Sequence, residues 1–162
     1  GDPAKIPKDI CVDYDERFIR RPTVKFICNR QVSHEFVRHR VFSFAQESTR
    51  YCNYTKDKFN NELNFIEPIW SKKDKGAHEQ LTSALRYAET YYRFLINSGW
   101  KPEQAATVLP NAMKTELIIT GAMPDWDHFF DLRALGTTGK PHPQAQELAL
   151  SLYNEFKEKG WL

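Results

Sequence analysis

The chain has 162 residues, of which 41% are hydrophobic and 14% aromatic, and its formal net charge is only +2. The length suits one domain with one apolar core, and the composition excludes an intrinsically disordered chain. Because no run approaches the roughly 18 apolar residues of a membrane-spanning helix, and no signal-peptide pattern is present, we predict a cytoplasmic protein without membrane contact.

The cysteines and histidines do not indicate a metal site. Cys11, Cys28 and Cys52 are too few and too irregularly spaced for a disulfide framework or a zinc site. The five histidines show no metal-ligand spacing. We therefore expect packed or idle thiols in a reducing compartment, and no bound metal.

The first 50 residues predict a lead-in, a strand and a short helix. Residues 1–22 are polar and aperiodic, which indicates a lead-in or the remnant of a missing N-terminal region. Residues 23–29 (TVKFICN) are β-branched and aromatic, which favours a strand. Ser33 is placed to cap a helix over residues 34–41, with three apolar side chains on its packed side: Phe36, Val37 and Val41. On that helix Glu35 and His39 would share a face, while Arg38 and Arg40 would diverge by about 200°.

The remaining chain predicts one edge strand, one long helix and several proline-initiated helices. Residues 63–70 indicate an edge strand interrupted by Pro68. Residues 74–98 carry apolar side chains at helical spacing before Gly99, namely Leu81, Leu85, Ala88, Tyr92 and Leu95. Residues 116–121 fit either a strand or a buried helix, and three prolines stand at plausible helix starts, Pro102, Pro124 and Pro143. These elements predict a single α+β domain over residues 23–162.

The segment RHRVFSFAQESTRY, residues 38–51, is the most unusual stretch of the chain. Residues 20–50 hold six arginines and one lysine against two glutamates, so the local charge is strongly positive. Arginine and hydroxyl donors suit phosphate, while Gln46 and Glu47 supply acceptors for a sugar or base. The composition fits a nucleotide site or, equally, a solvated basic surface. A nucleic-acid-binding module is a weaker interpretation, because the aromatic residues form no evident stacking platform.

The order of these residues resembles the signature of the flavin-dependent thymidylate synthases. Arg38, His39 and Arg40 are followed after seven residues by Ser48, and the likeness extends to Ser43, Arg50 and Tyr51. Residues 108–121 (VLPNAMKTELIITG) and 126–133 (WDHFFDLR) resemble a second region of the same family. The similarity covers roughly residues 23 to 158.

The resemblance implies a fold and a reaction. The family has a small, mostly antiparallel sheet with several helices, and it methylates dUMP to dTMP with methylene-tetrahydrofolate as carbon donor. FAD, reduced by NADPH, supplies the hydride. Members are homotetramers with sites at subunit interfaces, so we expect such a tetramer here.

The resemblance also implies residue roles. For FAD it implies five contacts: Arg38, His39, Arg40, Gln46 and His128. For dUMP it implies seven, some in the pocket of a neighbouring subunit: Glu35, Arg38, Gln46, Glu47, Ser48, Arg50 and Arg133. Arg133 would be the catalytic residue, because a permanently protonated guanidinium stabilises negative charge on the deprotonated pyrimidine. From the residues alone, Arg133 also fits a simple helix C-terminus, and His128 a core histidine.

Three positions depart from the family pattern. Ala106 stands where many members carry a nucleotide-binding arginine, and Ala122 and Pro124 replace an Asn and an Arg that often contact FAD. Residues 1–22 show no counterpart of the family's preceding histidine-containing segment. The alternative hypothesis is therefore a truncated or divergent member that binds nucleotide without catalysis.

Overall fold

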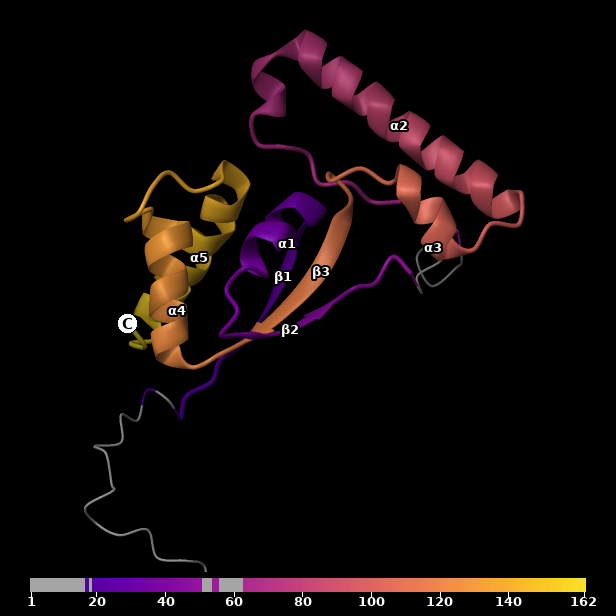
Figure 1. The fold of residues 1–162 in the computed structure, drawn as a ribbon. Coiled ribbons are helices and arrows are strands. Elements are labelled where there is room, and N and C mark those ends of the chain that lie inside the picture. Colours follow the sequence, from indigo (N-terminus) through magenta and orange to yellow (C-terminus); the bar gives the residue numbers. More distant parts are fainter. Residues whose placement is uncertain (1–16, 18, 51–53, 56–62) are drawn as a thin grey trace, which may run out of the picture.

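The computed structural model describes residues 17, 19–50, 54–55 and 63–162, and it shows an α+β fold (Figure 1). In chain order the elements are β1 (Thr23–Asn29), α1 (Arg30–Phe36), β2 (Ser43–Gln46), η4 (Ser71–Lys73), α2 (Lys75–Asn97), α3 (Pro102–Ala105), η5 (Ala106–Val108), β3 (Lys114–Thr120), α4 (Met123–Phe130), the π-helix η6 (Asp131–Leu135) and α5 (Pro143–Glu158). In the described residues no helix is both long and apolar enough to cross a membrane.

The three strands form an antiparallel sheet in the order β1-β3-β2. The pairing of β1 with β3 runs from Thr23 opposite Thr120 to Asn29 opposite Lys114. It joins two segments that lie far apart in the sequence. Side chains alternate along β3, and Thr115, Leu117 and Ile119 are buried. This alternation gives the sheet one face toward the main core.

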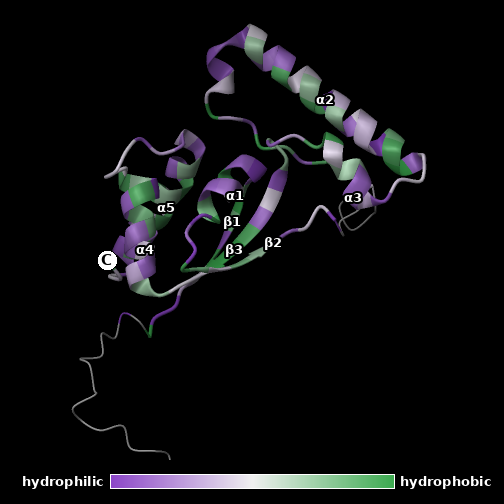
Figure 2. Ribbon diagram, viewed as in Figure 1, coloured by the Kyte–Doolittle hydropathy of each residue, from purple (hydrophilic) through white to green (hydrophobic). Residues whose placement is uncertain are grey.

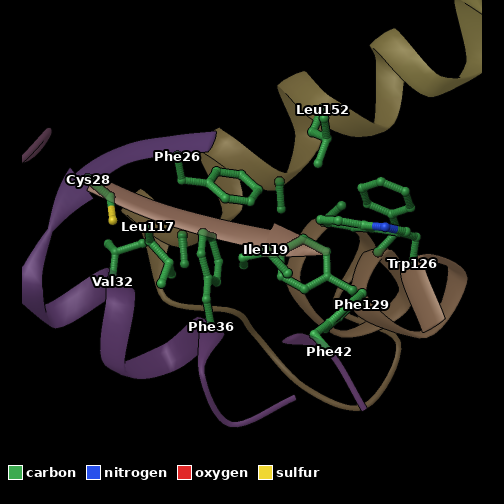
Figure 3. Close-up of a cluster of buried hydrophobic side chains, with 14 of the residues drawn as sticks. Phe26, Cys28, Val32, Phe36, Phe42, Leu117, Ile119, Trp126, Phe129 and Leu152 are labelled. Atoms are coloured by element: carbon green, nitrogen blue, oxygen red, sulfur yellow. The ribbon is translucent and has the colours of Figure 1, made fainter. Parts of the chain in front are cut away.

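The main core lies between the sheet and the helices α1, α4 and α5 (Figure 3). It is built largely from aromatic rings: Phe36 lies 4.9 Å from Phe26 and 5.0 Å from Phe129, between ring centroids. Trp126 packs 4.7 Å from Phe42. Each fully buried ring of this kind stabilises the fold by about 1.5–3 kcal/mol. The core therefore fixes the C-terminal end of α1 against α4.

A second, smaller cluster lies under α2. Tyr92 of α2 is fully buried and packs with four other buried residues, Tyr54, Leu63, Ala105 and Met113. Polar and apolar residues alternate along α2 (Figure 2), and its main neighbours are η4, α3 and η5. Met113 immediately precedes β3, so the central strand joins the two clusters.

Most of the predicted elements are confirmed. The strand at 23–29 and the long helix are present, with Asp74 capping α2 through a 3.0 Å bond from the Ala77 amide. Gly99 follows that helix with a φ of 91°, a value that favours glycine. Helices begin at or next to Pro102, Pro124 and Pro143. The ambiguous segment at 116–121 is a strand up to Thr120, where β3 ends.

The predicted helix at 34–41 is wrong in both of its limits. Asn29, not Ser33, caps α1, and its Oδ1 accepts from the amide of Val32 at 2.8 Å. The helix ends at Phe36, so Val37 and Val41 are 37% and 59% exposed instead of packed. Asn29 holds this position because it is the last β1 residue to pair with β3.

Two further predictions about strands need correction. Residues 63–70 contain only an isolated bridge from Phe65 to Met113, because the chain turns beyond Pro68, where the Ser71 amide bonds to the Pro68 carbonyl. Conversely, residues 43–46, where the sequence pattern predicts no helix or strand, form the edge strand β2. Most of the predicted lead-in, with Cys11, and Tyr51 and Cys52 lie outside the described residues. Cys28 is buried, as expected for a packed thiol.

Candidate functional site

The turn after α1 separates the histidine from the two arginines of the Arg-His-Arg run. The His39 amide bonds to the carbonyl of Phe36, and the Phe42 amide to the carbonyl of His39, each at 3.2 Å. This turn buries the His39 ring, whose centroid lies 5.1 Å from that of Phe129. Arg38 and Arg40 are exposed, and neither makes a hydrogen bond or ion pair with another described residue. Two exposed guanidinium groups therefore flank a buried histidine.

Arg133 lies in the π-helix η6 and is held by residues from the other end of the sequence. Its Nη1 donates to Glu35 Oε2 at 2.6 Å, and its Nη2 donates to the Glu35 carbonyl oxygen at 2.8 Å. Its Nε donates to His39 Nε2 at 3.0 Å. Single π-turns are frequent at functional sites, because they redirect one side chain from an otherwise regular helix. Here the redirected side chain is the predicted catalytic arginine.

The bond from Arg133 fixes the protonation state of His39. Because Nε2 accepts a hydrogen bond, the ring proton of neutral His39 must lie on Nδ1. Burial is the main cause that lowers the pKa of His39 from 6.5 to about 4, and the charges of Arg133 and His128 act in the same direction, against the opposing effect of Glu35. His39 is therefore neutral at pH 7 and supports the guanidinium without adding a second positive charge.

His128 lies beside this group without joining its hydrogen bonds. Its ring centroid is 6.0 Å from that of His39, and the residue is exposed on α4. The interpretation of His128 as a core histidine is therefore wrong. Its open position leaves the ring accessible to a ligand.

The second half of the motif lies along β2 and beyond it. Gln46 donates to the hydroxyls of Ser33 at 2.9 Å and Thr115 at 3.3 Å. The Glu47 amide bonds to the carbonyl of Glu116 at 3.0 Å, which extends the strand pairing.

Ser48 and Arg50 follow in an exposed turn. The Ser48 hydroxyl accepts from the amide of Arg50 at 3.2 Å, and the Arg50 side chain pairs with Glu103 at 2.8 Å. The structure thus brings together Glu35, His39 and Arg133, with His128 adjacent. Gln46 contacts α1 through Ser33, whereas Arg50 lies beside α3, where it pairs with Glu103.

An open cleft of about 450 Å³ adjoins Arg133. The residues that line it come from α1, η6 and the turn before α5: Glu35, Leu132, Arg133, Thr138, Gly139, Lys140, Pro141 and His142. The sequence interpretation missed the contribution of residues 138–142, although the glycines at 136 and 139 do signal a turn. Among the described residues no group of three or more potential ligands could hold a metal ion.

The family of the chain follows from comparison of its sequence with known proteins. The family described as thymidylate synthase complementing protein matches residues 21–159. The chain belongs to this family. The match includes every residue of the site described above.

Individual family members show moderate identity. The chain is 37% identical over 106 residues to a flavin-dependent thymidylate synthase of Pyrococcus furiosus, covering 65% of this chain and 43% of the relative. For the enzyme of that name in Geobacter sulfurreducens the identity is 34% over 105 residues, covering 65% and 44%. For that of Thermococcus kodakarensis it is 29% over 122 residues, covering 74% and 49%. The chain thus spans less than half the length of these family members.

The positions that depart from the family pattern have structural roles here. Ala122 is buried at the N-cap of α4, and its amide donates to Asp125 Oδ2 at 3.1 Å. Pro124 occupies the first turn of that helix, where a missing amide hydrogen has no cost. Ala106 begins η5 and is partly exposed. These residues are thus compatible with the helix ends, and they add no charged group there.

Proposed function

We propose that the chain is a flavin-dependent thymidylate synthase, which converts dUMP to dTMP with methylene-tetrahydrofolate as carbon donor. FAD reduced by NADPH supplies the hydride when it is bound. Family membership and the names of the relatives support the reaction class. The observation that carries the proposal is the Arg133 arrangement, in which the motif histidine and Glu35 hold the one arginine expected to act on the substrate.

Arg133 is suited to electrostatic stabilisation of the substrate. Its side chain is only 15% exposed, so its charge acts in a medium of lower polarity than water. Glu35 and His39 fix its orientation before any ligand arrives, which avoids reorganisation when negative charge develops on the pyrimidine. In this role Arg133 holds charge and does not abstract a proton.

The remaining motif residues fit the two nucleotides of the proposed reaction. The exposed Arg38 and Arg40 would hold the negatively charged phosphates of FAD, and His39 and His128 would lie beside its ring system. Gln46 and Glu47 supply polar groups for dUMP along β2, and Ser48 and Arg50 would take its phosphate. Glu103 must then release Arg50, because the two side chains are paired in the free chain.

A homotetramer is part of the proposal, because Arg133 lies on η6 and is held by α1, whereas Arg50 lies beside α3 and pairs with Glu103. Helix α2 carries three aromatic residues at helical spacing, and Tyr87, Tyr91 and Phe94 are 62%, 57% and 65% exposed. An apolar stripe of this kind supports association between copies of the chain. Light scattering after size exclusion tests the expected mass of four chains.

Turnover by the purified protein tests the function. With dUMP, methylene-tetrahydrofolate, NADPH and FAD the protein should form dTMP, and dUMP should perturb the flavin absorption spectrum. Arg133→Ala should abolish turnover while FAD remains largely bound, and Arg86→Ala on the exposed side of α2 is the matched control. Loss of FAD together with turnover in Arg133→Ala would contradict the role given to Arg133.

A second candidate function is nucleotide binding without catalysis. The absence of an arginine at positions 106 and 124 favours it, because the loss of each charged contact weakens nucleotide binding by about 1.5–3 kcal/mol. The absence of an asparagine at position 122 removes one more polar contact. This function predicts dUMP binding without NADPH oxidation in the presence of the folate. Any formation of dTMP excludes it.

A further inference from the structure

The turn between η6 and α5 has a defined shape. Gly136 ends η6 with a φ of 69°, and a side chain there would meet Pro141 Cδ at 2.9 Å and the carbonyl oxygen of Gly139 at 3.0 Å. The Thr137 amide bonds to the carbonyl of Asp131 at 3.0 Å, and the Gly139 amide to that of Gly136 at 3.2 Å. The backbone therefore folds back closely on itself and holds Thr138 and Lys140 at the rim of the cleft beside Arg133.

The cleft contains more hydrogen-bond donors than its own residues use. Arg133 donates three of its five N–H groups to Glu35 and His39, which leaves one on each terminal nitrogen. Lys140 is exposed and makes no ion pair within the described ranges. Thr138 adds a hydroxyl. The facing carboxylate, Glu35, is already bonded to Arg133.

His142 contributes an imidazole to the wall of the same cleft. Its Nδ1 is shielded from solvent without a hydrogen-bond partner in the described part of the chain. A shielded nitrogen of this kind costs free energy unless a partner satisfies it. Its ring lies 5.7 Å from that of Trp70, which fixes the orientation of the imidazole.

We propose that the 136–142 turn and Arg133 form a subsite for one oxyanion group of a substrate, bound by Lys140 and the Thr138 hydroxyl. With Arg133 and Lys140 positive and Glu35 negative, the cleft has one net positive charge when His142 is neutral, which suits a single phosphate or carboxylate. The identity of the substrate rests on the proposed function. That function gives the dUMP phosphate to Ser48 and Arg50, so a glutamyl carboxylate of the folate is the source expected here, and the dUMP phosphate is the alternative that the test distinguishes.

Titration with inorganic phosphate tests the subsite without reference to the reaction. In the full chain the amide NMR signals of Thr138 and Gly139 should shift with phosphate and saturate. Lys140→Ala should weaken this binding about fivefold, and Thr138→Val should weaken it without changing charge. Lys73→Ala, which removes an exposed lysine of η4, is the matched control and should leave the phosphate affinity unchanged. Unchanged affinity in both cleft variants, or no shift at Gly139, would overturn the subsite.

Paired ligands then identify the source. If the dUMP phosphate binds here, Lys140→Ala weakens dUMP but not deoxyuridine. If a folate carboxylate binds here, the same variant weakens tetrahydrofolate but not a tetrahydropterin that lacks the glutamyl tail. Equal effects on each member of a pair, or none, would overturn the assignment to a substrate. A protein that binds phosphate at Gly139 but takes up neither FAD nor dUMP would instead refute the proposed function and leave the subsite standing.

Discussion

Replacing Glu35 by glutamine removes the carboxylate that accepts from Arg133 Nη1 at 2.6 Å, while the volume of the side chain is kept. The two side chains are 15% and 30% exposed, for Arg133 and Glu35 respectively. The pair therefore lies between surface pairs, which contribute about 0.2–1 kcal/mol, and buried pairs, whose disruption costs about 3–5 kcal/mol. The main-chain bond from Arg133 to the Glu35 carbonyl survives the change, so we expect a coupling energy of about 2 kcal/mol.

A double-mutant cycle measures this coupling. Urea unfolding of Glu35→Gln, Arg133→Gln and the double variant gives the interaction free energy directly. A matched cycle on Lys25 and Glu116, which lie 3.3 Å apart and are 53% and 38% exposed, should give less than about 1 kcal/mol. Coupling of the same size in both cycles would refute the inference that partial burial strengthens the site pair.

The pKa of His39 supplies a second test of the Arg133–Glu35 pair, because the two substitutions should shift this pKa in opposite directions. Arg133 lowers this pKa and Glu35 raises it, so Arg133→Gln should raise the pKa of His39 and Glu35→Gln should lower it further. NMR titration of the imidazole protons measures both changes. Shifts in the same direction for the two variants would show that His39 does not lie between these charges.

Three further predictions concern the fold around the site. A Cβ on Gly121 would lie 2.1 Å from Phe42 Cδ1, so Gly121→Ala should lower the free energy of unfolding, measured with urea, by about 1–3 kcal/mol. Gly76→Ala is the control: a Cβ there lies 3.5 Å from its nearest atom, and the free energy of unfolding should stay the same or rise. The pKa of His39 falls from 6.5 to about 4 on folding. The free energy of unfolding should therefore be highest above pH 6.5 and decrease by about 3 kcal/mol as the pH falls toward 4. The same decrease in His39→Gln would contradict this. Burial raises the pKa of the Cys28 thiol to about 12, so this thiol should react with a thiol reagent only after the protein unfolds. Mass spectrometry that detects rapid modification of Cys28 in the native protein would argue against this prediction.

Local patterns predicted the elements whose limits are set by local chemistry. The long helix follows from apolar spacing, and the helices after Pro102, Pro124 and Pro143 follow from the fixed φ of proline. The end of α1 could not be predicted in this way. Asn29 and Ser33 are both good capping residues, and the choice between them depends on how far β1 pairs with a strand some 90 residues later.

The site shows the same division between local and distant information. The sequence placed Glu35 and His39 together for the wrong reason, because the expected helix ends before His39. They meet instead through Arg133, which bonds to both. The 136–142 turn gave no signal beyond its glycines, since an exposed threonine and lysine are common on any surface. Its place beside Arg133 results from the packing of α5 against η6.

The bonds of Arg133 reach residues 94 and 98 positions earlier in the chain. Such contacts form only after the loop between them has closed, which makes them slow to assemble. The guanidinium is thus locked in place only in molecules whose first strand has already paired with the third. The ring contacts of the main core, such as that of Phe36 with Phe129, span the same loop. The guanidinium and the aromatic core should therefore become ordered in one step, so the geometry of this one side chain reports the closure of the whole fold.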